Sequence, residues 1–403
     1  MAPLGPSFDE CPGKSLGGYL DKQIRMGKLL ELLRKIKFNW MLFVFLVFQR
    51  IILILVTYLI VTSNPQYYFL KPFTKFIETF ARRWDGNSYL FIAEHGYVTK
   101  GPEAGFIVFP PIYPLLVKIV NVIFSNYEFS AFLLSNVFFI ASCFVFYKLL
   151  KLDFTEKFSR IVIVLLSIFP TSYFFSTGYP ESLFIFLSML SFYFARKNKW
   201  ILASIFCMIA TLTRPFGAVI WPALFLLWVK ENKKPNNLIF LILGLATSAI
   251  TYFGINFYLF NNPLAFQRFL SSTWQKSFQF PWIGLIDSWK RGFGTGYGFE
   301  YRFYIGFTEA IASSIAYVFA FLGLSKKILP NSYYAAFLLL GVVFFTSTNF
   351  ILSSPRYLLS LFPFFIILTK VLNNKLTISI WVVISIALGL YFSTILARGM
   401  WAF

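Results

Sequence analysis

The stretch Phe38–Val61, FNWMLFVFLVFQRIILILVTYLIV, decides the fold class. An α-helix needs about 20 predominantly apolar residues to cross the hydrocarbon layer of a membrane, and this stretch is long enough. Comparable apolar runs recur along the chain, for example at Phe129–Leu150 and Leu376–Leu396. These runs predict an all-α polytopic membrane helical bundle of about eleven transmembrane helices, with interfacial helices in the first outward loop.

The composition of the 403-residue chain suits a lipid environment. Hydrophobic residues make up 58% and charged residues 13% of the sequence, whereas a soluble domain has about 25% charged residues. The net charge of +20 comes from lysines and arginines scattered over short segments between helices. Because the charge does not gather on one soluble face, the composition argues against nucleic-acid binding. It favours a role in orienting the chain, since cytoplasmic loops carry excess Lys and Arg.

The distribution of basic residues predicts how the chain threads the membrane. The basic segment 1–37 is expected to be cytoplasmic, and the rest, 38–403, forms one integral membrane domain. The first outward loop is then 63–128, and the second large outward loop is 261–303. The basic turns between helices fall on the inside, near residues 151–158, 196–199, 230–237, 325–332 and 370–375.

One apolar run, Gly105–Phe124, is expected not to cross the membrane. Pro110, Pro111 and Pro114 interrupt its helical hydrogen bonding, which leaves only about ten good helical residues after them. If this run crossed, the basic turn near 151–158 would face outward, against the charge rule. The sequence therefore predicts a re-entrant or interfacial segment here.

Metal-binding and nucleophilic side chains are few. Cys143 and Cys207 lie inside apolar runs, and Cys11 lies in the polar N-terminal stretch, so no disulfide framework or metal cluster is readable. His95 is the only histidine of the chain. A Ser/His/Asp arrangement or a multi-histidine metal site would therefore depend on His95, and we expect neither.

The first outward loop holds the main candidate for a catalytic residue. Asp85 follows Arg83 and Trp84 and stands immediately before a short predicted interfacial helix. A carboxylate at this place is a candidate general base that takes the proton of an acceptor hydroxyl group. The alternative interpretation is an N-cap of the helix. Arg83 is either a ligand of a phosphate anion or a contact to lipid headgroups.

Two further pairs of polar residues are candidates for substrate contacts. Glu94 and His95 either assist the acceptor or are solvated interface residues. Tyr179 and Glu181 precede an apolar run, and a carboxylate there is either a substrate contact or a partner of the positive end of the helix dipole.

Single cations at the ends of apolar runs are candidate phosphate ligands. Arg214 and Arg356 lie at such ends on the predicted outward face. Cations of this kind are costly in a membrane and tend to serve a ligand or an ion pair, although snorkelling is the alternative. Gln275, beside Trp274 in the second outward loop, is a candidate sugar contact, and its tryptophan neighbour is equally a membrane anchor.

These motifs resemble those of the PIG-V family, the GPI mannosyltransferase 2 group of GT-C glycosyltransferases, including its prokaryotic relatives. The resemblance is carried by blocks in family order over about residues 38–400: Arg83-Trp84-Asp85, Ile92 to Tyr97, Phe109 to Pro114, Phe175 to Phe184, the Arg214 segment and Pro355-Arg356-Tyr357.

The resemblance implies an inverting hexosyltransferase that depends on a lipid-phosphate sugar. Its donor would be polyprenyl or dolichyl phosphate mannose, and its acceptor a lipid-linked glycan of the GPI-anchor type. Asp85 matches the family's first-loop aspartate. The expected substrate contacts are Arg83, Trp84, Glu94, His95, Tyr179, Glu181, Arg214, Gln275 and Arg356. No cofactor or metal is expected, because arginines can neutralise a monophosphate.

The resemblance also implies a location and further partners. The active site would face the non-cytoplasmic side of the endoplasmic reticulum membrane in a eukaryote, or of the plasma membrane in a prokaryote. Besides membrane lipid, a small accessory membrane subunit is an expected partner. Two alternatives stay open: a GT-C transferase for another lipid-linked sugar or acceptor, and a transporter or flippase of lipid-linked sugars, for which broken helices with polar pairs near mid-membrane are typical.

Overall fold

The computed structural model describes residues 40–231 and 234–403, so the predicted cytoplasmic segment 1–37, with Cys11, lies outside the described residues. The arrangement below concerns the compact unit Leu46–Phe403. Regular structure in the described residues is helical, apart from one isolated antiparallel bridge between Phe278 and Thr348. The predicted all-α class is confirmed.

Long apolar helices make the chain a multi-pass membrane protein. Five in the described residues are long and apolar enough to cross a membrane: α2 (Trp40–Thr62), α6 (Tyr127–Leu150), α11 (Pro235–Phe260), the continuous stretch Phe299–Gly323 and α19 (Lys375–Ala397). The stretch Phe299–Gly323 consists of α14 (Phe299–Tyr301), η5 (Arg302–Phe307) and α15 (Thr308–Gly323). Three apolar helices are shorter: α9 (Trp200–Thr211), α16 (Ser332–Thr346) and α18 (Phe362–Val371). The number of about eleven spans stays a prediction.

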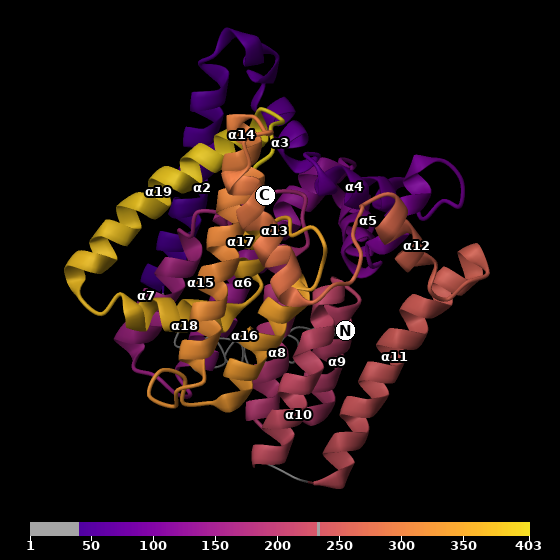
Figure 1. Cartoon of the computed structure of the whole chain (residues 1–403), viewed down its shortest axis with the longest axis vertical. Helices are drawn as coiled ribbons and strands as arrows, with labels where there is room; N and C mark the ends of the chain where they lie inside the picture. Colours follow the sequence, from indigo (N-terminus) through magenta and orange to yellow (C-terminus); the bar gives the residue numbers. More distant parts are fainter. Residues whose placement is uncertain (1–39, 232–233) are drawn as a thin grey trace, which may run out of the picture. The chain divides into compact units, whose positions relative to one another are not determined.

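The first predicted outward loop folds into short helices. It contains η1 (Pro65–Leu70), α3 (Phe73–Ala81), α4 (Asp85–His95), η2 (Pro102–Val108) and α5 (Ile112–Phe124). In Figure 1, α4 and α5 lie together near α12 (Ala265–Ser272), which packs on η2 and follows α11. The helices not yet named are α7 (Glu156–Ser167), η3 (Ser172–Ser176), α8 (Glu181–Arg196), η4 (Pro215–Val219), α10 (Ile220–Glu231), α13 (Pro281–Phe293) and α17 (Ser354–Leu359).

The interruption predicted from three prolines is present. Helices η2 and α5 meet at an angle of 108°, and Pro110 and Pro111 lie in the break. The freed backbone groups find partners from other parts of the chain: the amide of Ile112 donates to the carbonyl of Leu212 (3.1 Å), and the Tyr97 hydroxyl donates to the carbonyl of Phe109 (2.5 Å). A broken span and a re-entrant segment share this geometry, so the re-entrant interpretation stays a prediction.

Three of the turns predicted to face inward meet at Arg196. Its guanidinium makes a bidentate pair with the carboxylate of Asp153, at 2.7 and 3.0 Å. The same group lies 3.6 Å from a carboxylate oxygen of Glu231. These contacts tie together the turns that follow α6, α8 and α10.

The two remaining basic turns join this cluster through Lys370. Its ammonium group donates to the carbonyl of Lys327 (2.9 Å) and lies 5.4 Å from the centroid of the Phe154 ring. All five turns that the charge pattern placed on one side are therefore linked to one another by contacts. The side of the membrane that they face stays a prediction.

A buried arginine of α2 holds the turn between α7 and η3. Arg50 donates to the carbonyls of Ser172 (2.7 Å) and Ser167 (2.5 Å), and its guanidinium lies 4.1 Å from the centroid of the Phe139 ring. Buried carbonyl groups need hydrogen-bond donors, and in hydrocarbon no water supplies them. Arg50 thus fixes the chain just before the segment that leads to α8.

Two glycines, Gly178 in the turn before α8 and Gly86 in α4, lie close to the carbonyl oxygen of Ala81 at the end of α3. A Cβ atom on Gly178 would lie 2.4 Å from the carbonyl oxygen of Ala81, and one on Gly86 would lie 2.2 Å from the same oxygen. Both separations are far inside van der Waals contact. The turn that precedes α8 is therefore seated against the α3–α4 turn by main-chain atoms.

We predict that Gly178→Ala destabilises the protein, because the new methyl group forces the two turns apart and overpacking of this kind costs about 1–3 kcal/mol. The measurement is the apparent melting temperature of the detergent-purified protein. The matched control is Gly254→Ala in α11, where a Cβ meets no atom within 4 Å and where alanine should favour the helix by about 1 kcal/mol. Equal melting temperatures for the two variants would contradict the close approach.

Candidate active site

Asp85 is the first residue of α4, and its carboxylate faces an arginine from a distant part of the chain. Its Oδ2 atom lies 2.9 Å from Nη1 of Arg356, and 22% of its side chain is exposed. The N-cap position belongs to Trp84, whose φ of 48° and ψ of −123° are in a region that favours glycine. The N-cap interpretation of Asp85 is therefore not supported, and its side chain serves the ion pair.

Arg356 connects two carboxylates. It lies in α17, and its Nε atom is 3.2 Å from Oε1 of Glu181. The guanidinium carbon is 5.2 Å from the centroid of the Tyr179 ring and 5.4 Å from that of Phe174. Aromatic faces stabilise a cation that is removed from water. Arg356 is thus buried between two anions and two rings.

Glu181 and Arg214 complete this group. Glu181 is the first residue of α8, is 1% exposed, and lies 3.0 Å from Nη1 of Arg214. The same Nη1 atom donates to the Ser360 hydroxyl (3.0 Å). Neither carboxylate oxygen of Glu181 makes a hydrogen bond of good geometry in the described residues, so its attraction to the arginines is through charge. We call Asp85, Glu181, Arg214 and Arg356 the charge cluster.

The structure places two predicted substrate contacts, Arg83 and Trp84, away from the charge cluster. Arg83 donates to the carbonyl of Ala397 from Nη2 (2.7 Å) and from Nε (3.2 Å), and burial lowers its pKa. Trp84 donates from its indole to the carbonyl of Met400 (3.1 Å) and packs edge-on against Trp401. Arg83 therefore holds the end of α19, and Trp84 holds the segment that follows it.

Other predicted contacts also lie outside the charge cluster. Glu94 is paired with Arg82, which also contacts Glu128 at 2.5 Å. His95 is 58% exposed and stacks on Phe91 within the same helix.

Of the remaining predicted contacts, one lies at the charge cluster and one does not. Gln275 is exposed, and its backbone carbonyl accepts from the Asn349 side chain (3.1 Å). Tyr179 lies under Arg356, and its hydroxyl donates to the carbonyl of Arg83 (2.9 Å).

Glu309, a carboxylate that the sequence analysis missed, positions Arg356. It is fully buried in α15 and accepts from the backbone amides of Ser353 and Ser354, at 2.7 Å each. These amides are orphan donors at the start of α17. The Thr171 hydroxyl binds the carbonyl of Pro355 (2.8 Å). The sequence contains a signal for Glu309, because this carboxylate lies inside the apolar stretch Phe299–Gly323. An ionisable residue inside such a stretch is a candidate for a functional site.

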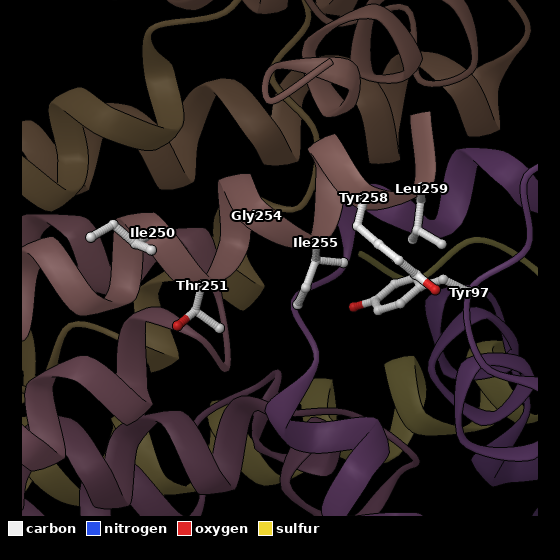
Figure 2. Close-up of a pocket in the computed structure, with 7 residues that line it drawn as sticks. All are labelled: Tyr97, Ile250, Thr251, Gly254, Ile255, Tyr258 and Leu259. Atoms are coloured by element: carbon white, nitrogen blue, oxygen red, sulfur yellow. The ribbon is translucent and has the colours of Figure 1, made fainter. Parts of the chain in front are cut away.

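An open apolar groove of about 520 Å³ lies between α11 and the loop after α4. In Figure 2, Tyr97 faces Ile255 and Tyr258, and Ile250 and Thr251 extend the groove along α11.

No group of three or more His, Cys, Asp or Glu side chains suitable for a metal ion occurs in the described residues. The absence of a metal requirement stays a prediction.

We predict that Glu309→Gln lowers the melting temperature. The glutamine side chain has one acceptor oxygen, which can serve only one of the two backbone N–H groups, and its NH₂ group would face the second N–H group, a donor against a donor. A buried donor left unpaired costs about 1–3 kcal/mol. The control is Glu300→Gln, an exposed carboxylate just ahead of α15. Thermal unfolding in detergent measures both, and an unchanged Glu309→Gln protein would contradict the capping role.

Comparisons with known proteins agree with the motif resemblance. A family model described as dolichyl-phosphate-mannose-protein mannosyltransferase, a GT-C family, matches residues 109–256. The matched region includes Glu181 and Arg214 of the charge cluster, and Asp85 and Arg356 lie outside it.

A curated relative and a solved structure are also similar. The chain is 31% identical over 129 residues to the GPI mannosyltransferase pigv-1 of Caenorhabditis elegans, which corresponds to 28% of this chain and 19% of the relative's length. The crystal structure of the Archaeoglobus fulgidus oligosaccharyltransferase in complex with zinc and sulfate aligns with a TM-score of 0.40 and 12% identity, over 81% of this chain and 49% of that one. The family match and the relative confirm the resemblance to GT-C glycosyltransferases of the PIG-V kind that the sequence motifs predict.

Proposed function

We propose that this chain is a membrane glycosyltransferase that moves mannose from polyprenyl or dolichyl phosphate mannose to a lipid-linked glycan of the GPI-anchor type. The observation that carries the proposal is the charge cluster, in which a partly exposed carboxylate and two arginines from three separate segments share one site. The family match and the name of the relative support the reaction class. The active site would face the non-cytoplasmic side.

Asp85 is the carboxylate best placed to act as the general base. A base must reach the proton that it removes, and the Asp85 side chain is 22% exposed whereas that of Glu181 is 1% exposed. Glu181 lies between two arginines and serves to hold them. In the proposed reaction, Asp85 takes the proton of the acceptor hydroxyl, whose oxygen forms a bond to the anomeric carbon of the sugar.

The arginines are suited to the leaving group. As the bond between the anomeric carbon and the phosphate oxygen breaks, its electron pair stays on the phosphate, whose charge changes from −1 in the diester to −2 in the monoester. Guanidinium groups bind phosphate oxygens with directed hydrogen bonds, and preorganised charge at the place where charge develops lowers the barrier. Arg356 and Arg214 supply this charge without a metal ion.

The ion pair between Asp85 and Arg356 couples the two events. When Asp85 takes the proton, it loses the negative charge that holds Arg356 at 2.9 Å. Glu181 still holds the Nε side of the guanidinium, and its Nη1 atom becomes available to the phosphate at the moment when the phosphate gains charge. Arg356 thus pairs with the carboxylate of Asp85 before the transfer and binds the phosphate of the leaving group after it.

The groove beside α11 supports a lipid carrier. Its lining is apolar, and it begins at Tyr97, two residues beyond the end of the helix that starts at Asp85. An 11-residue helix is about 16 Å long at 1.5 Å per residue. The hydrocarbon chain of a polyprenyl phosphate donor would therefore reach this groove after several isoprene units.

We predict that Asp85→Asn lowers kcat by a factor of about 10² to 10⁴, the usual contribution of a positioned base. The assay follows mannose transfer from polyprenyl phosphate mannose to extracted lipid acceptors at matched protein abundance. It contains a chelator, because we propose that no divalent ion is required. Asp153→Asn, at the other arginine-paired aspartate, is the matched control and should leave turnover near the normal value.

Near-normal transfer by Asp85→Asn would remove the proposed base. Glu94→Gln and Glu181→Gln in the same assay would then identify the carboxylate that replaces it. Competition between mannose, glucose and galactose donors on the same carrier tests the sugar, and formation of a glycosylated product separates a transferase from a flippase.

We predict that Gly254→Phe raises KM for a long-chain donor and leaves KM for a short-chain water-soluble donor unchanged. The position faces open space in the groove, so the ring fills the groove without displacing protein atoms. Ile242→Phe, at an exposed position of the same helix outside the groove, is the control. Equal effects on both donors would rule out the groove as a chain-binding surface.

A further inference from the structure

Hydrogen bonds join the predicted second outward loop, 261–303, to the segment between α16 and α17. Phe278 and Thr348 form an antiparallel bridge, and the amide of Gln279 donates to the carbonyl of Ser347 (3.3 Å). The amide of Ser277 donates to the Asn349 side chain (2.7 Å). These bonds attach residues 277–279 of the loop to residues 347–349. The latter residues lie between α16 and α17, the helix that carries Arg356.

Lys276 belongs to the same loop, directly before residues 277–279. Gln275, just before it, has φ of 52°, a left-handed conformation that costs energy for a residue with a side chain. The Lys276 side chain has no carboxylate within ion-pair distance in the part of the chain that the structure describes. Its charge nevertheless acts on Tyr357 and on Glu309, so Lys276 lies within electrostatic range of the start of α17.

Tyr357 lies between the two arginines of the charge cluster. The guanidinium carbons of Arg214 and Arg356 are 5.3 and 5.9 Å from the centroid of its ring. The ring stacks on Phe345 at 5.5 Å, with planes 7° apart, so it cannot swing away freely. Residues 40–231 and 234–403 offer its hydroxyl no hydrogen-bond partner, and the residue is partly exposed.

The electrostatic environment of the Tyr357 hydroxyl is positive. Burial by itself would raise the pKa of Tyr357, but the charges of Lys276, Arg214 and Arg356 outweigh burial and lower the pKa below its ordinary value. A more acidic hydroxyl is a better hydrogen-bond donor to an anion. The anion itself must come from a ligand, because Asp85 and Glu181 are already paired with the arginines.

We propose that Tyr357 and Lys276 complete the binding site for the phosphate of the lipid carrier, with the Tyr357 hydroxyl donating a hydrogen bond to a phosphate oxygen and the Lys276 ammonium group supplying charge. This proposal rests on the proposed function and adds two substrate-binding residues to it. Asp85 and Glu181 offset the charges of Arg214 and Arg356, so Lys276 provides the net positive charge that a phosphate requires.

The test compares polyprenyl monophosphate with polyprenol, which has the same chain and no phosphate. Binding of both is measured for the detergent-purified protein, the Tyr357→Phe variant and the Lys276→Gln variant. Each substitution should weaken polyprenyl monophosphate binding about tenfold, as expected for a lost hydrogen bond to a charged group. Polyprenol binding should not change, whereas a purely structural role would weaken both ligands.

Two control substitutions keep the test specific. Lys290→Gln removes an exposed lysine from the same loop, and Tyr68→Phe removes an exposed hydroxyl from η1; neither should alter binding of either ligand. If the unaltered protein binds monophosphate no better than polyprenol, the proposed function fails. If it discriminates between them and both variants keep that discrimination, the assignment of Tyr357 and Lys276 is overturned and the proposed function stands.

Discussion

The contact of Arg356 with Asp85 and Glu181 is the constraint on which the rest of the site depends. A cation buried in an apolar protein is costly unless anions and aromatic faces surround it, and Arg356 has both. The three residues lie in α17, α4 and α8, which are distant in sequence. The need to neutralise one guanidinium therefore places the start of α17 beside the starts of α4 and α8.

The surroundings show how the bundle supports these buried charges. Glu309 satisfies the amides at the start of α17, the Thr171 hydroxyl donates to the carbonyl of Pro355, and Arg50 donates to the carbonyls of Ser167 and Ser172, on either side of Thr171. The amides at the start of α17 have no acceptor inside their own helix, and the other two contacts add donors to buried carbonyl groups. Side chains in the apolar layers thus perform a task that water performs at the helix ends of soluble proteins.

Much of the fold followed from apolar length and loop charge alone. Runs such as Phe129–Leu150 are single helices, and the basic turns that were grouped by charge make contact through Arg196 and Lys370. The site was harder to predict. Arg83 and Arg356 both belong to short motifs, and the sequence offers no reason to prefer one of them as a site residue. Only the packing of the helices decides that Arg356 pairs with Asp85 whereas Arg83 donates to a backbone carbonyl. Glu309 and Arg50 were not predicted because they lie inside apolar runs rather than at their ends.

The contact of Gly86 and Gly178 with one carbonyl oxygen has an evolutionary consequence. Because main-chain atoms set the distance between the α3–α4 turn and α8, the side chains that face the substrate are not needed to maintain it. Homologues can exchange those side chains for others, and so adapt to a different sugar or a different lipid, while the carboxylate and its arginine keep their separation. Diversity of specificity within such a lineage would then require few compensating substitutions in the scaffold.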